Sequence, residues 1–437
     1  MNARKTALNI LLRVKNDGAY SNIAVLEEIN NSKLDKRDAA LATTLVYGVL
    51  ERQITLDYII SLYSKIKPPK ITDITLISLR MGVYQLRYLD KIPVFSAINE
   101  SVNLVKTSRE KSAYPFVNAV LRKISSEKNI KMPEDEIERL SVEASSPIWL
   151  IDSLKSDYGI KTAKKILFSG FGGQGVSVRV NTLKTNTNEL SETLENEGIA
   201  AEINPLVENA LLLKNTGSIA SLDSFKNGLF HIVDTASLLC VKALDIQENS
   251  TVFDVCAAPG GKTFTVAQEA KNGTVSAADI HEHKIKLIKN DAKRLNLQNI
   301  KVFINNAEKY NDKLGEFDRV LCDVPCSGIG IIRKKPEISY KVVTFLDKLT
   351  EIQYSILRTS ARYVKKGGIM VYSTCTLRHN ENRDIVEKFL NENKNFDGIP
   401  VLQRIKRTIK EKENMLTLFP HINGTDGFFI SAFRRVK

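Results

Sequence analysis

Two cysteines, each inside a short polar motif, are the residues of this sequence best suited to covalent chemistry. Cys326 lies in Asp-Val-Pro-Cys-Ser-Gly and Cys375 lies in Ser-Thr-Cys-Thr. A cysteine thiolate can add to an electron-poor ring carbon and form a covalent intermediate. One thiol can act as that nucleophile, so the second thiol needs a separate role in the same reaction.

A glycine-rich turn after a predicted strand is the second chemical feature. Residues Thr251 to Cys256 have the pattern of a buried strand and lead into Ala257-Ala-Pro-Gly-Gly-Lys-Thr263, after which a helix is expected. A Gly-Gly turn at the carboxyl end of a strand lets a ligand approach the backbone closely. The turn matches neither the phosphate-binding Gly-x4-Gly-Lys-Ser/Thr motif nor the Gly-x-Gly-x-x-Gly motif of dinucleotide-binding folds. A plain tight connection is the alternative.

Polar side chains end the next three predicted strands. Asp279 ends the second strand, where a carboxylate could hold ribose hydroxyls, although it could instead cap the following helix. Asn305 and Asn306 end the third strand, where an amide could reach an adenine edge, and turn formation explains them equally well. Asp323 ends the fourth strand. The strand-end polar residues Asp279, Asn305 and Asn306, in register, favour a cofactor that contains adenosine over three unrelated turns.

Paired cysteines downstream of this turn favour methylation of carbon 5 of cytosine. Carbon 5 of the intact ring is a poor nucleophile, so a thiolate must first add to carbon 6 and generate an enamine. Cys326 and Cys375 both follow predicted strands and should face one cleft, where charge and solvent can promote the thiolate form. The residues alone leave open which of the two attacks. Cys240 and Cys322 lie in apolar patterns and are expected in the core.

The elements that must position these residues alternate between strand and helix from residue 236 onward. This alternation predicts an α/β fold with a parallel, doubly wound sheet of the Rossmann type. The predicted strands are Val252–Cys256, Val275–Ile280, Val302–Ile304, Arg319–Asp323, Ile369–Ser373 and Gly427–Phe433. The predicted helices are Lys262–Ala270, His283–Leu295 and Leu346–Tyr363.

The front of the chain has a different pattern, that of a compact all-helical bundle over residues 1–127. Its clearest predicted helices are Asp35–Leu50, Ile54–Tyr63, Ile71–Tyr88, Ser96–Lys106 and Pro115–Ile124. Residues 128–146 are polar and predict a linker that can hold one short helix. Residues 147–235 mix helix and strand patterns and predict a small α+β module, which leaves residues 236–437 for the α/β domain.

The charge of the chain favours a polyanionic partner. The net charge is +13, and residues 1–130 carry 20 Lys and Arg against 12 Asp and Glu. This excess of basic residues favours nucleic acid over a membrane as the partner, because the sequence shows no isolated basic amphipathic helix of the kind that binds a membrane surface. A basic surface that is merely solvated is the alternative.

Composition also bounds the location and the cofactor. No run of about eighteen apolar residues suggests a transmembrane helix. No export signal is visible and the five cysteines are odd in number, so we expect a cytoplasmic protein with reduced thiols. The histidines show no zinc spacing, so no metal is expected.

Several motifs resemble those of RNA cytosine-C5 methyltransferases that use S-adenosylmethionine. They are Cys256–Thr263, Asp323–Gly328, Arg333–Glu337, Ser373–Thr376 and Asp426–Phe429. The front half resembles the NusB RNA-binding fold, notably in Phe116–Lys123, and Ser145–Trp149 and Arg179–Lys184 resemble the connecting module of this family. A NusB-like domain fused to such a class I methyltransferase is similar to the enzymes that modify cytosine 967 of 16S ribosomal RNA. The resemblance therefore implies 16S ribosomal RNA as the partner, and we expect a monomer.

The resemblance also implies residue roles. The segment that would line the methionine and ribose of S-adenosylmethionine consists of Cys256, Ala257, Ala258, Pro259, Gly260, Gly261 and Lys262. Asp279 would hold the ribose, and Asp323 would lie between cofactor and base. Asn306 stands where the family commonly has aspartate for the adenine amino group, and an amide oxygen can accept the same hydrogen bond. Cys375 would attack carbon 6, and Cys326 would assist release.

Three other functions remain to be weighed. A transfer RNA could be the substrate instead of ribosomal RNA. The chain could also be a NusB-like RNA-binding or antitermination factor without catalysis, although both cysteines, Asp323 and the glycine turn are intact. A protein or small-molecule methyltransferase would leave the paired cysteines unexplained.

Overall fold

The computed structural model describes residues 2–171, 175–214, 216–340, 343–401 and 414–437. The chain folds as two compact units. The first contains Met1–Phe171 together with Ile332–Lys341, and the second contains Gly172–Ile331 and Val342–Lys437. The domain boundaries predicted near residues 127, 146 and 235 stay predictions. Within the described residues, no helix is long and apolar enough to cross a membrane.

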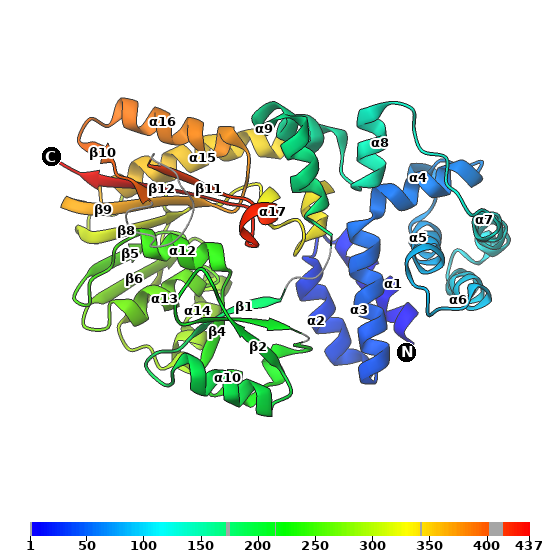
Figure 1. The fold of residues 1–437 in the computed structure, drawn as a ribbon, viewed down its shortest axis with the longest axis horizontal. Coiled ribbons are helices and arrows are strands. Elements are labelled where there is room, and N and C mark those ends of the chain that lie inside the picture. Colours follow the sequence, from blue (N-terminus) through cyan, green and yellow to red (C-terminus); the bar gives the residue numbers. More distant parts are fainter. Residues whose placement is uncertain (1, 172–174, 215, 341–342, 402–413) are drawn as a thin grey trace. The chain divides into compact units, whose positions relative to one another are not determined.

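The first unit is helical, as its sequence pattern predicts. Its apolar stripes pack into one core that includes Leu8, Leu45 and Ile60, all fully buried. Short polar side chains start several of the helices, because they bind backbone N–H groups that lack a partner in the first turn. Asp35, for example, accepts from the N–H of Asp38. The helices are α1(Ala3–Asn16), α2(Ser21–Ser32), α3(Lys36–Glu51), α4(Gln53–Tyr63), α5(Asp73–Tyr88), α6(Val94–Lys106), α7(Tyr114–Ser126), α8(Glu136–Glu143) and α9(Ile148–Phe168) (Figure 1).

The stretch predicted as a linker contains α8, which packs onto the helical core. The Thr55 hydroxyl donates to the carbonyl of Val142 at 2.5 Å, and the N–H of Ile54 donates to Oγ of Ser145 at 3.0 Å. The following helix, α9, is interrupted by Gly159, which has a φ of +73°. Residues 136–171 therefore fold with the helical unit.

A short segment from the second half of the sequence also folds with the first unit. It contains the 3-10 helix η5(Pro336–Tyr340). The carboxylate of Glu337 accepts from the N–H and the hydroxyl of Ser21, at 3.2 and 2.8 Å, in the first turn of α2. The hydroxyl of Tyr340 donates to the carbonyl of Leu50 at 2.9 Å. This segment therefore supplies a cap that α2 lacks in its own sequence.

The second unit begins with a small antiparallel sheet of order β2-β3-β1-β4. Its apolar side chains, among them Val178, Leu190 and Phe230, form a separate core. The elements are β1(Val176–Val180), α10(Thr187–Asn196), β2(Ala200–Ile203), β3(Ala210–Lys214), α11(Asp223–Lys226) and β4(Phe230–Ile232). This confirms the predicted α+β module and adds β2, which has no clear alternation in its sequence.

The main sheet has eight strands in the order β10-β12-β9-β8-β5-β6-β7, with β11 paired to β12. Strands β5 to β9 are parallel, whereas β10, β11 and β12 pair antiparallel. Helices α12, α13 and α14 cover one face, and α15 and α16 cover the other (Figure 1). The elements are α12(Thr235–Ala243), β5(Thr251–Asp254), α13(Gly261–Glu269), β6(Thr274–Asp279), α14(Glu282–Leu295), β7(Ile300–Ile304), β8(Phe317–Asp323), α15(Val343–Ala361), β9(Val364–Thr374), α16(Arg383–Glu392), β10(Phe396–Gly398), β11(Met415–Leu418), α17(Pro420–Asn423) and β12(Phe428–Arg435). The doubly wound α/β prediction is confirmed.

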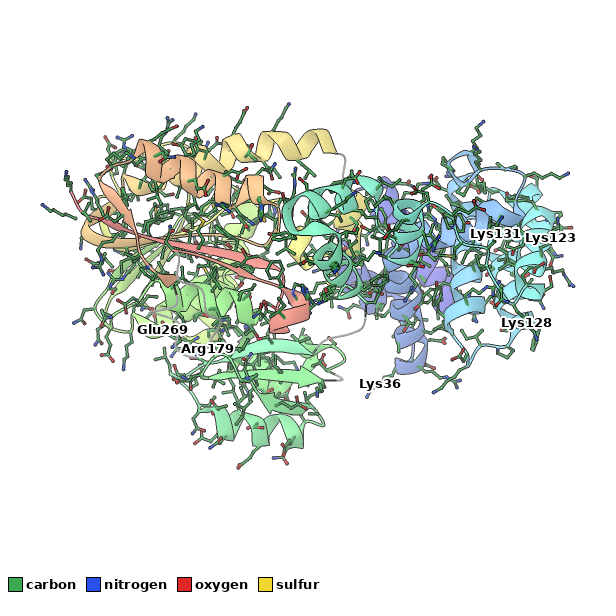
Figure 2. The ribbon with its side chains drawn as sticks, turned by 45° about the horizontal axis from the view of Figure 1, so that its top comes forward. Lys36, Lys123, Lys128, Lys131, Arg179 and Glu269 are labelled. Atoms are coloured by element: carbon green, nitrogen blue, oxygen red, sulfur yellow. The ribbon has the colours of Figure 1, made fainter. Side chains whose placement is uncertain are left out.

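The motif Arg179–Lys184 joins the small sheet to the main domain. The buried side chain of Asn181 donates to the carbonyls of Gly228 and Leu295, at 2.9 and 2.8 Å. Arg179 is also buried and lies 3.6 Å from the carboxylate of Glu269 on α13 (Figure 2). These contacts fix the module against α13 and α14, so the motif is explained by packing between two parts of the second unit.

Candidate active site

The residues singled out in the sequence gather where the parallel strands end. Asp279 is the last residue of β6 and Asp323 is the last residue of β8. Cys375 follows the last residue of β9, and Cys326 lies in the loop after β8. Because β8 and β9 are neighbours that run in the same direction, both cysteine loops leave the same edge of the sheet.

The two cysteine side chains meet at this edge. Their sulfur atoms are 3.2 Å apart, both residues are half-buried, and all five cysteines of the chain are free thiols. The hydrogen bond to Cys375 and burial raise the pKa of the Cys326 thiol well above its usual range. By geometry, either sulfur can be the donor in this contact. Two further thiols, Cys240 and Cys322, are fully buried in the core, as predicted.

Asp323 is held between the cofactor turn and the cysteine strand. Its Oδ2 atom lies 2.6 Å from Nζ of Lys262, and its Oδ1 atom accepts from the hydroxyl of Ser373 at 2.7 Å. Burial by itself lowers the pKa of Lys262, but the charge and hydrogen bond of Asp323 outweigh it and the net shift is upward. Lys262 therefore stays charged and fixes the carboxylate. In the sequence, the resemblance implied only that this lysine lines the cofactor, and its pairing with Asp323 was not predicted.

The turn after β5 has a conformation that only glycine adopts easily at one position. Gly260 has a φ of +111°, and a Cβ there would lie 2.4 Å from the ring of Phe264. The packing of the turn thus accounts for this glycine without any ligand. Helix α13 starts at Gly261 with no side-chain cap and no acidic residue in its first turn. Its first N–H groups can therefore bind an anionic group.

The polar residues after β6 and β7 have different surroundings. Asp279 is buried, and its Oδ1 accepts from the N–H of His281 at 2.9 Å in the turn before α14, which leaves the second oxygen for a ligand. Among the described residues, no side chain caps the first turn of α14. Asn306 accepts from the N–H of Glu308 at 3.0 Å, so it stabilises a turn. Asn305 is buried, and no residue within the described ranges binds its Nδ2. Asn306 stays the predicted contact of the adenine edge, and the unpartnered Nδ2 makes Asn305 a second candidate.

The order of the strands separates two groups of residues. The turn after β5 lies between the ends of β6 and β7 on one side and the ends of β8 and β9 on the other. Asp279, Asn305 and Asn306 lie on the first side, whereas Asp323 and the cysteines lie on the second. Lys262 links the turn to the second group.

The sequence did not indicate the polar network behind the cysteines. Glu381 is fully buried and binds the N–H of Ser327, the residue after Cys326. Its only sequence signal is the polar run Asn380–Asn382 after the Ser-Thr-Cys-Thr motif, which could equally be a helix start. In the part of the chain that the structure describes, no group of three His, Cys, Asp or Glu residues could hold a metal ion.

Family models match nearly the whole chain in three segments. Residues 241–434 match the model described as 16S rRNA methyltransferase RsmB/F, and residues 1–126 match the NusB family. Residues 146–220 match the ferredoxin-like domain described as RsmF/B-like.

Some relatives match this chain over nearly their whole length. The chain is 39% identical to a Bacillus subtilis protein named "Probable ribosomal RNA small subunit methyltransferase B", over 99% of this chain and 98% of that protein. It is 30% identical to a Synechocystis protein of the same name, over the full length of both. Among solved structures, that of PH0851 covers 100% of this chain and 99% of its own, with a TM-score of 0.87 and 25% identity. A methyltransferase homologue from Pyrococcus horikoshii, 26% identical, covers 69% of this chain and 100% of its own with a TM-score of 0.60.

Proposed function

Because this chain belongs to the RsmB/F family of 16S rRNA methyltransferases, we propose that it methylates carbon 5 of a cytosine in 16S ribosomal RNA, at position 967. The observation that carries the proposed chemistry is the pair of free thiols, 3.2 Å apart, at the ends of β8 and β9. Carbon 5 methylation needs one thiol to add to the ring and a second group to release the product. Few other methyl-transfer reactions need two thiols.

The cofactor of the family is S-adenosylmethionine, whose sulfonium supplies the methyl group. The site residues fit this molecule. The uncapped first turn of α13 offers N–H groups to its carboxylate, and Asp279 offers an oxygen to the ribose hydroxyls. The buried Nδ2 of Asn305 is a donor for a purine nitrogen. The backbone from Cys256 to Lys262 would line the cofactor between these points.

Cys375 is proposed as the nucleophile. A thiol that keeps its proton is a poor nucleophile, and Cys326 has a raised pKa because of its hydrogen bond to Cys375. The Cys375 thiolate adds to carbon 6, and the electron pair of the ring double bond moves toward carbon 5.

Asp323 is proposed to support this addition from the edge of the ring. Protonation of the ring at N3 prevents negative charge from accumulating there, and a carboxylate beside N3 stabilises the protonated form. The bonds from Lys262 and Ser373 fix both oxygens of Asp323, so the carboxylate does not need to reorganise during the reaction.

Cys326 is proposed to release the product. Once Cys375 is bound to carbon 6, its sulfur no longer carries the charge that holds the proton on Cys326, and this proton can leave to solvent. The Cys326 thiolate then takes the proton from carbon 5. The electron pair of that C–H bond restores the ring double bond while the carbon–sulfur bond breaks, and Cys375 leaves as a thiolate.

The helical unit is proposed to bind the RNA. Lys123, Lys128 and Lys131 are exposed at the end of α7 and in the chain that follows it (Figure 2). Lysine side chains neutralise phosphates and supply affinity that does not depend on sequence. Together with the +13 net charge, they support a polyanionic substrate.

The test of this function is to incubate single cysteine variants with 16S ribosomal RNA and S-adenosylmethionine, and to look for protein–RNA adducts on denaturing gels. We expect Cys326→Ala to accumulate an adduct, because attack proceeds and release fails. Cys375→Ala should form none. Cys322→Ala removes a buried core thiol that precedes Asp323 on β8 but points to the other face of the sheet, and it should behave as the unchanged protein. An adduct in Cys375→Ala, with none in Cys326→Ala, would reverse the two roles.

The position and the RNA class are tested separately. Bisulfite sequencing of the product should show one new 5-methylcytosine, at position 967 of 16S ribosomal RNA. Transfer RNA is included as a competing substrate, and preferential methylation of it would contradict the proposed substrate. Absence of methyl transfer to either RNA would favour a binding protein without catalysis.

A further inference from the structure

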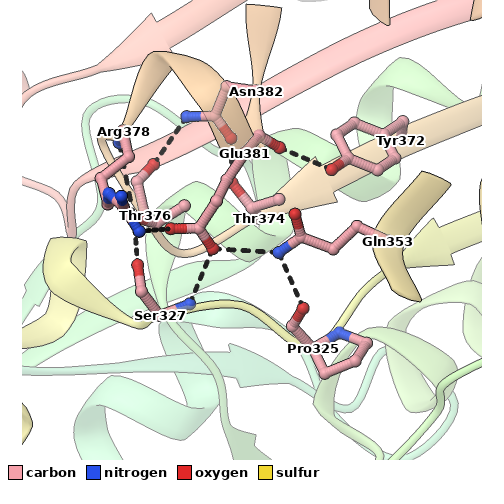
Figure 3. A network of polar contacts seen from close by, with 9 residues as sticks. All are labelled: Pro325, Ser327, Gln353, Tyr372, Thr374, Thr376, Arg378, Glu381 and Asn382. Carbon is pink, nitrogen blue, oxygen red and sulfur yellow. Dashed lines mark hydrogen bonds and ion pairs between the residues drawn. The ribbon is translucent and has the colours of Figure 1, made fainter. Parts of the chain in front are cut away.

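A buried carboxylate lies behind the two cysteine loops. Glu381 has no exposed surface, and four side-chain or backbone groups bind it (Figure 3). A buried carboxylate is costly unless hydrogen bonds or a charge partner compensate it. Arg378 forms an ion pair with it, at a distance of 3.5 Å. Two neutral donors, the N–H of Ser327 in the Cys326 loop and Nε2 of Gln353 on α15, also bind the carboxylate.

Glu381 fixes the loop of Cys326 on both sides of the cysteine. Its Oε2 accepts from the N–H of Ser327 at 2.8 Å. The same oxygen accepts from Nε2 of Gln353 at 2.9 Å, and this Nε2 also donates to the carbonyl of Pro325 at 2.9 Å. One carboxylate oxygen of Glu381 is thus linked to both neighbours of Cys326, directly to Ser327 and through Gln353 to Pro325.

The same network reaches the segment that carries Cys375. The hydroxyl of Tyr372 binds the carbonyl of Glu381 at 2.6 Å, and the hydroxyls of Ser327 and Thr376 are 2.7 Å apart. Asn382, the next residue, accepts from the Thr374 hydroxyl and donates to the Thr376 carbonyl, at 2.5 and 3.0 Å. Both neighbours of Cys375 are therefore tied to the short turn that contains Glu381 (Figure 3).

The chemistry of the network requires a carboxylate. Two donors, the N–H of Ser327 and Nε2 of Gln353, point at one oxygen, while Arg378 faces the other. In glutamine, one of these positions becomes an NH₂ group. That group would face a donor whichever way the amide is turned, and a buried donor would lose its partner.

We propose that Glu381 is a positioning residue that sets the place of Cys326 relative to Cys375 and thereby controls product release. This rests on the roles of the two cysteines proposed above. Glu381 binds the N–H of Ser327 directly and reaches the carbonyl of Pro325 through Gln353. The Cys375 strand, in contrast, is also held by pairing with β8 and β12. Loss of the carboxylate should therefore displace Cys326 more than Cys375, so attack continues while release slows.

The test compares Glu381→Gln with the unchanged protein in two measurements on 16S ribosomal RNA. In a single turnover, methyl transfer to RNA should be retained within about threefold. In steady state, turnover should fall by roughly 10- to 100-fold, the order expected when a reacting group is misplaced by about 1 Å. The covalent adduct should accumulate on denaturing gels. Glu387→Gln is the matched control, because Glu387 is an exposed glutamate on α16.

A double variant separates positioning from a general loss of structure. In the Cys326→Ala background, Glu381→Gln should change the adduct level by less than about twofold, because the residue through which it acts is already gone. A change in the adduct level of the double variant well beyond twofold would overturn the proposal. So would an unchanged steady-state turnover in Glu381→Gln, or a loss of single-turnover methyl transfer in that variant.

Two controls keep the outcome interpretable. If Glu381→Gln does not fold, as judged by its melting temperature, Gln353→Met decides, because it cuts only the tie to Pro325 and one of the donors to Glu381. That variant should also accumulate adduct, and failure to do so would overturn the proposal. Failure of the proposed function looks different: Cys326→Ala alone would then trap no adduct, whatever residue 381 is.

Discussion

His231 contacts the start of α13, next to the cofactor turn, and its protonation makes the stability of the fold depend on pH. Its Nε2 lies 3.1 Å from the carbonyl of Gly261 and 3.2 Å from the hydroxyl of Thr265, at the start of α13. Nδ1 has no partner among the described residues. Burial lowers the pKa of His231 to about 3, because a second proton on the ring would create a buried charge without a partner.

This residue predicts a loss of stability in mild acid. Between about pH 6.5 and 3 the unfolded chain binds a proton on His231 that the folded chain does not, so the unfolding free energy falls as pH falls, by about 1.4 kcal/mol per unit. His231→Gln lacks this proton. The difference in unfolding free energy between the two proteins should shrink by about 2 kcal/mol from pH 7.5 to pH 5 in urea titrations.

The comparison with the variant is needed because another group titrates in the opposite direction. Burial raises the pKa of Asp254 to about 7, and this makes the folded state bind the extra proton and lose stability as pH rises. Asp254 is present in both proteins, so its contribution cancels in the difference. A difference that stays constant with pH would contradict the prediction for His231.

At the scale of elements, the segment Ile332–Lys341 illustrates how a motif can serve a distant helix. It follows the Cys326 loop in sequence but folds with the helical unit. The residue before α2, Tyr20, makes no side-chain cap, and Glu337 takes that place through Ser21. A carboxylate at a helix N-terminus is also favoured by the helix dipole.

Removal of this cap should loosen α2. Glu337→Ala should lower the local stability of α2 by about 1 kcal/mol, the usual effect of a lost N-cap. Hydrogen exchange at the amides of α2 should then be roughly fivefold faster, by the same free energy. Glu337→Gln keeps one acceptor for Ser21 and should show a smaller change. Amides of α6 in the same unit serve as the internal control, and equal acceleration there would indicate general destabilisation instead.

At the scale of the whole molecule, the positive charge of the chain should affect RNA binding much more than cofactor binding. The +13 net charge is densest at the front of the chain, where residues 1–130 have eight more basic than acidic residues. Each phosphate that a lysine neutralises releases a counterion, so binding weakens as salt rises. Binding of the small cofactor should depend on salt much less.

This argument predicts which lysines set the salt dependence. In filter-binding or anisotropy titrations, replacing both Lys123 and Lys128 by alanine should make the slope of log affinity against log salt shallower by about 1.4 to 1.8. Replacing both Lys286 and Lys289, which are exposed on α14, removes the same charge and is the control. Equal changes in the two double variants would assign the effect to net charge rather than to the helical unit.

Local pattern alone was enough to predict much of the fold and the place of the chemistry. Apolar runs that end in Asp279 and Asp323 predicted where strands end, because a buried strand must be apolar and its polar residues collect at the sheet edge. The alternation of strands and helices predicted their parallel arrangement. Since neighbouring parallel strands end at one edge, the closeness of Cys326 and Cys375 could be expected from these patterns.

Only the tertiary structure decided which polar groups bind one another. The pairs Lys262–Asp323 and Glu381–Ser327 join residues more than fifty positions apart, and no local periodicity encodes such a choice. The same holds for Glu337, whose partner Ser21 is over three hundred residues away. Secondary structure follows from the spacing of apolar residues along the chain, whereas a hydrogen-bond partner is fixed only when folding brings two distant atoms within about 3 Å.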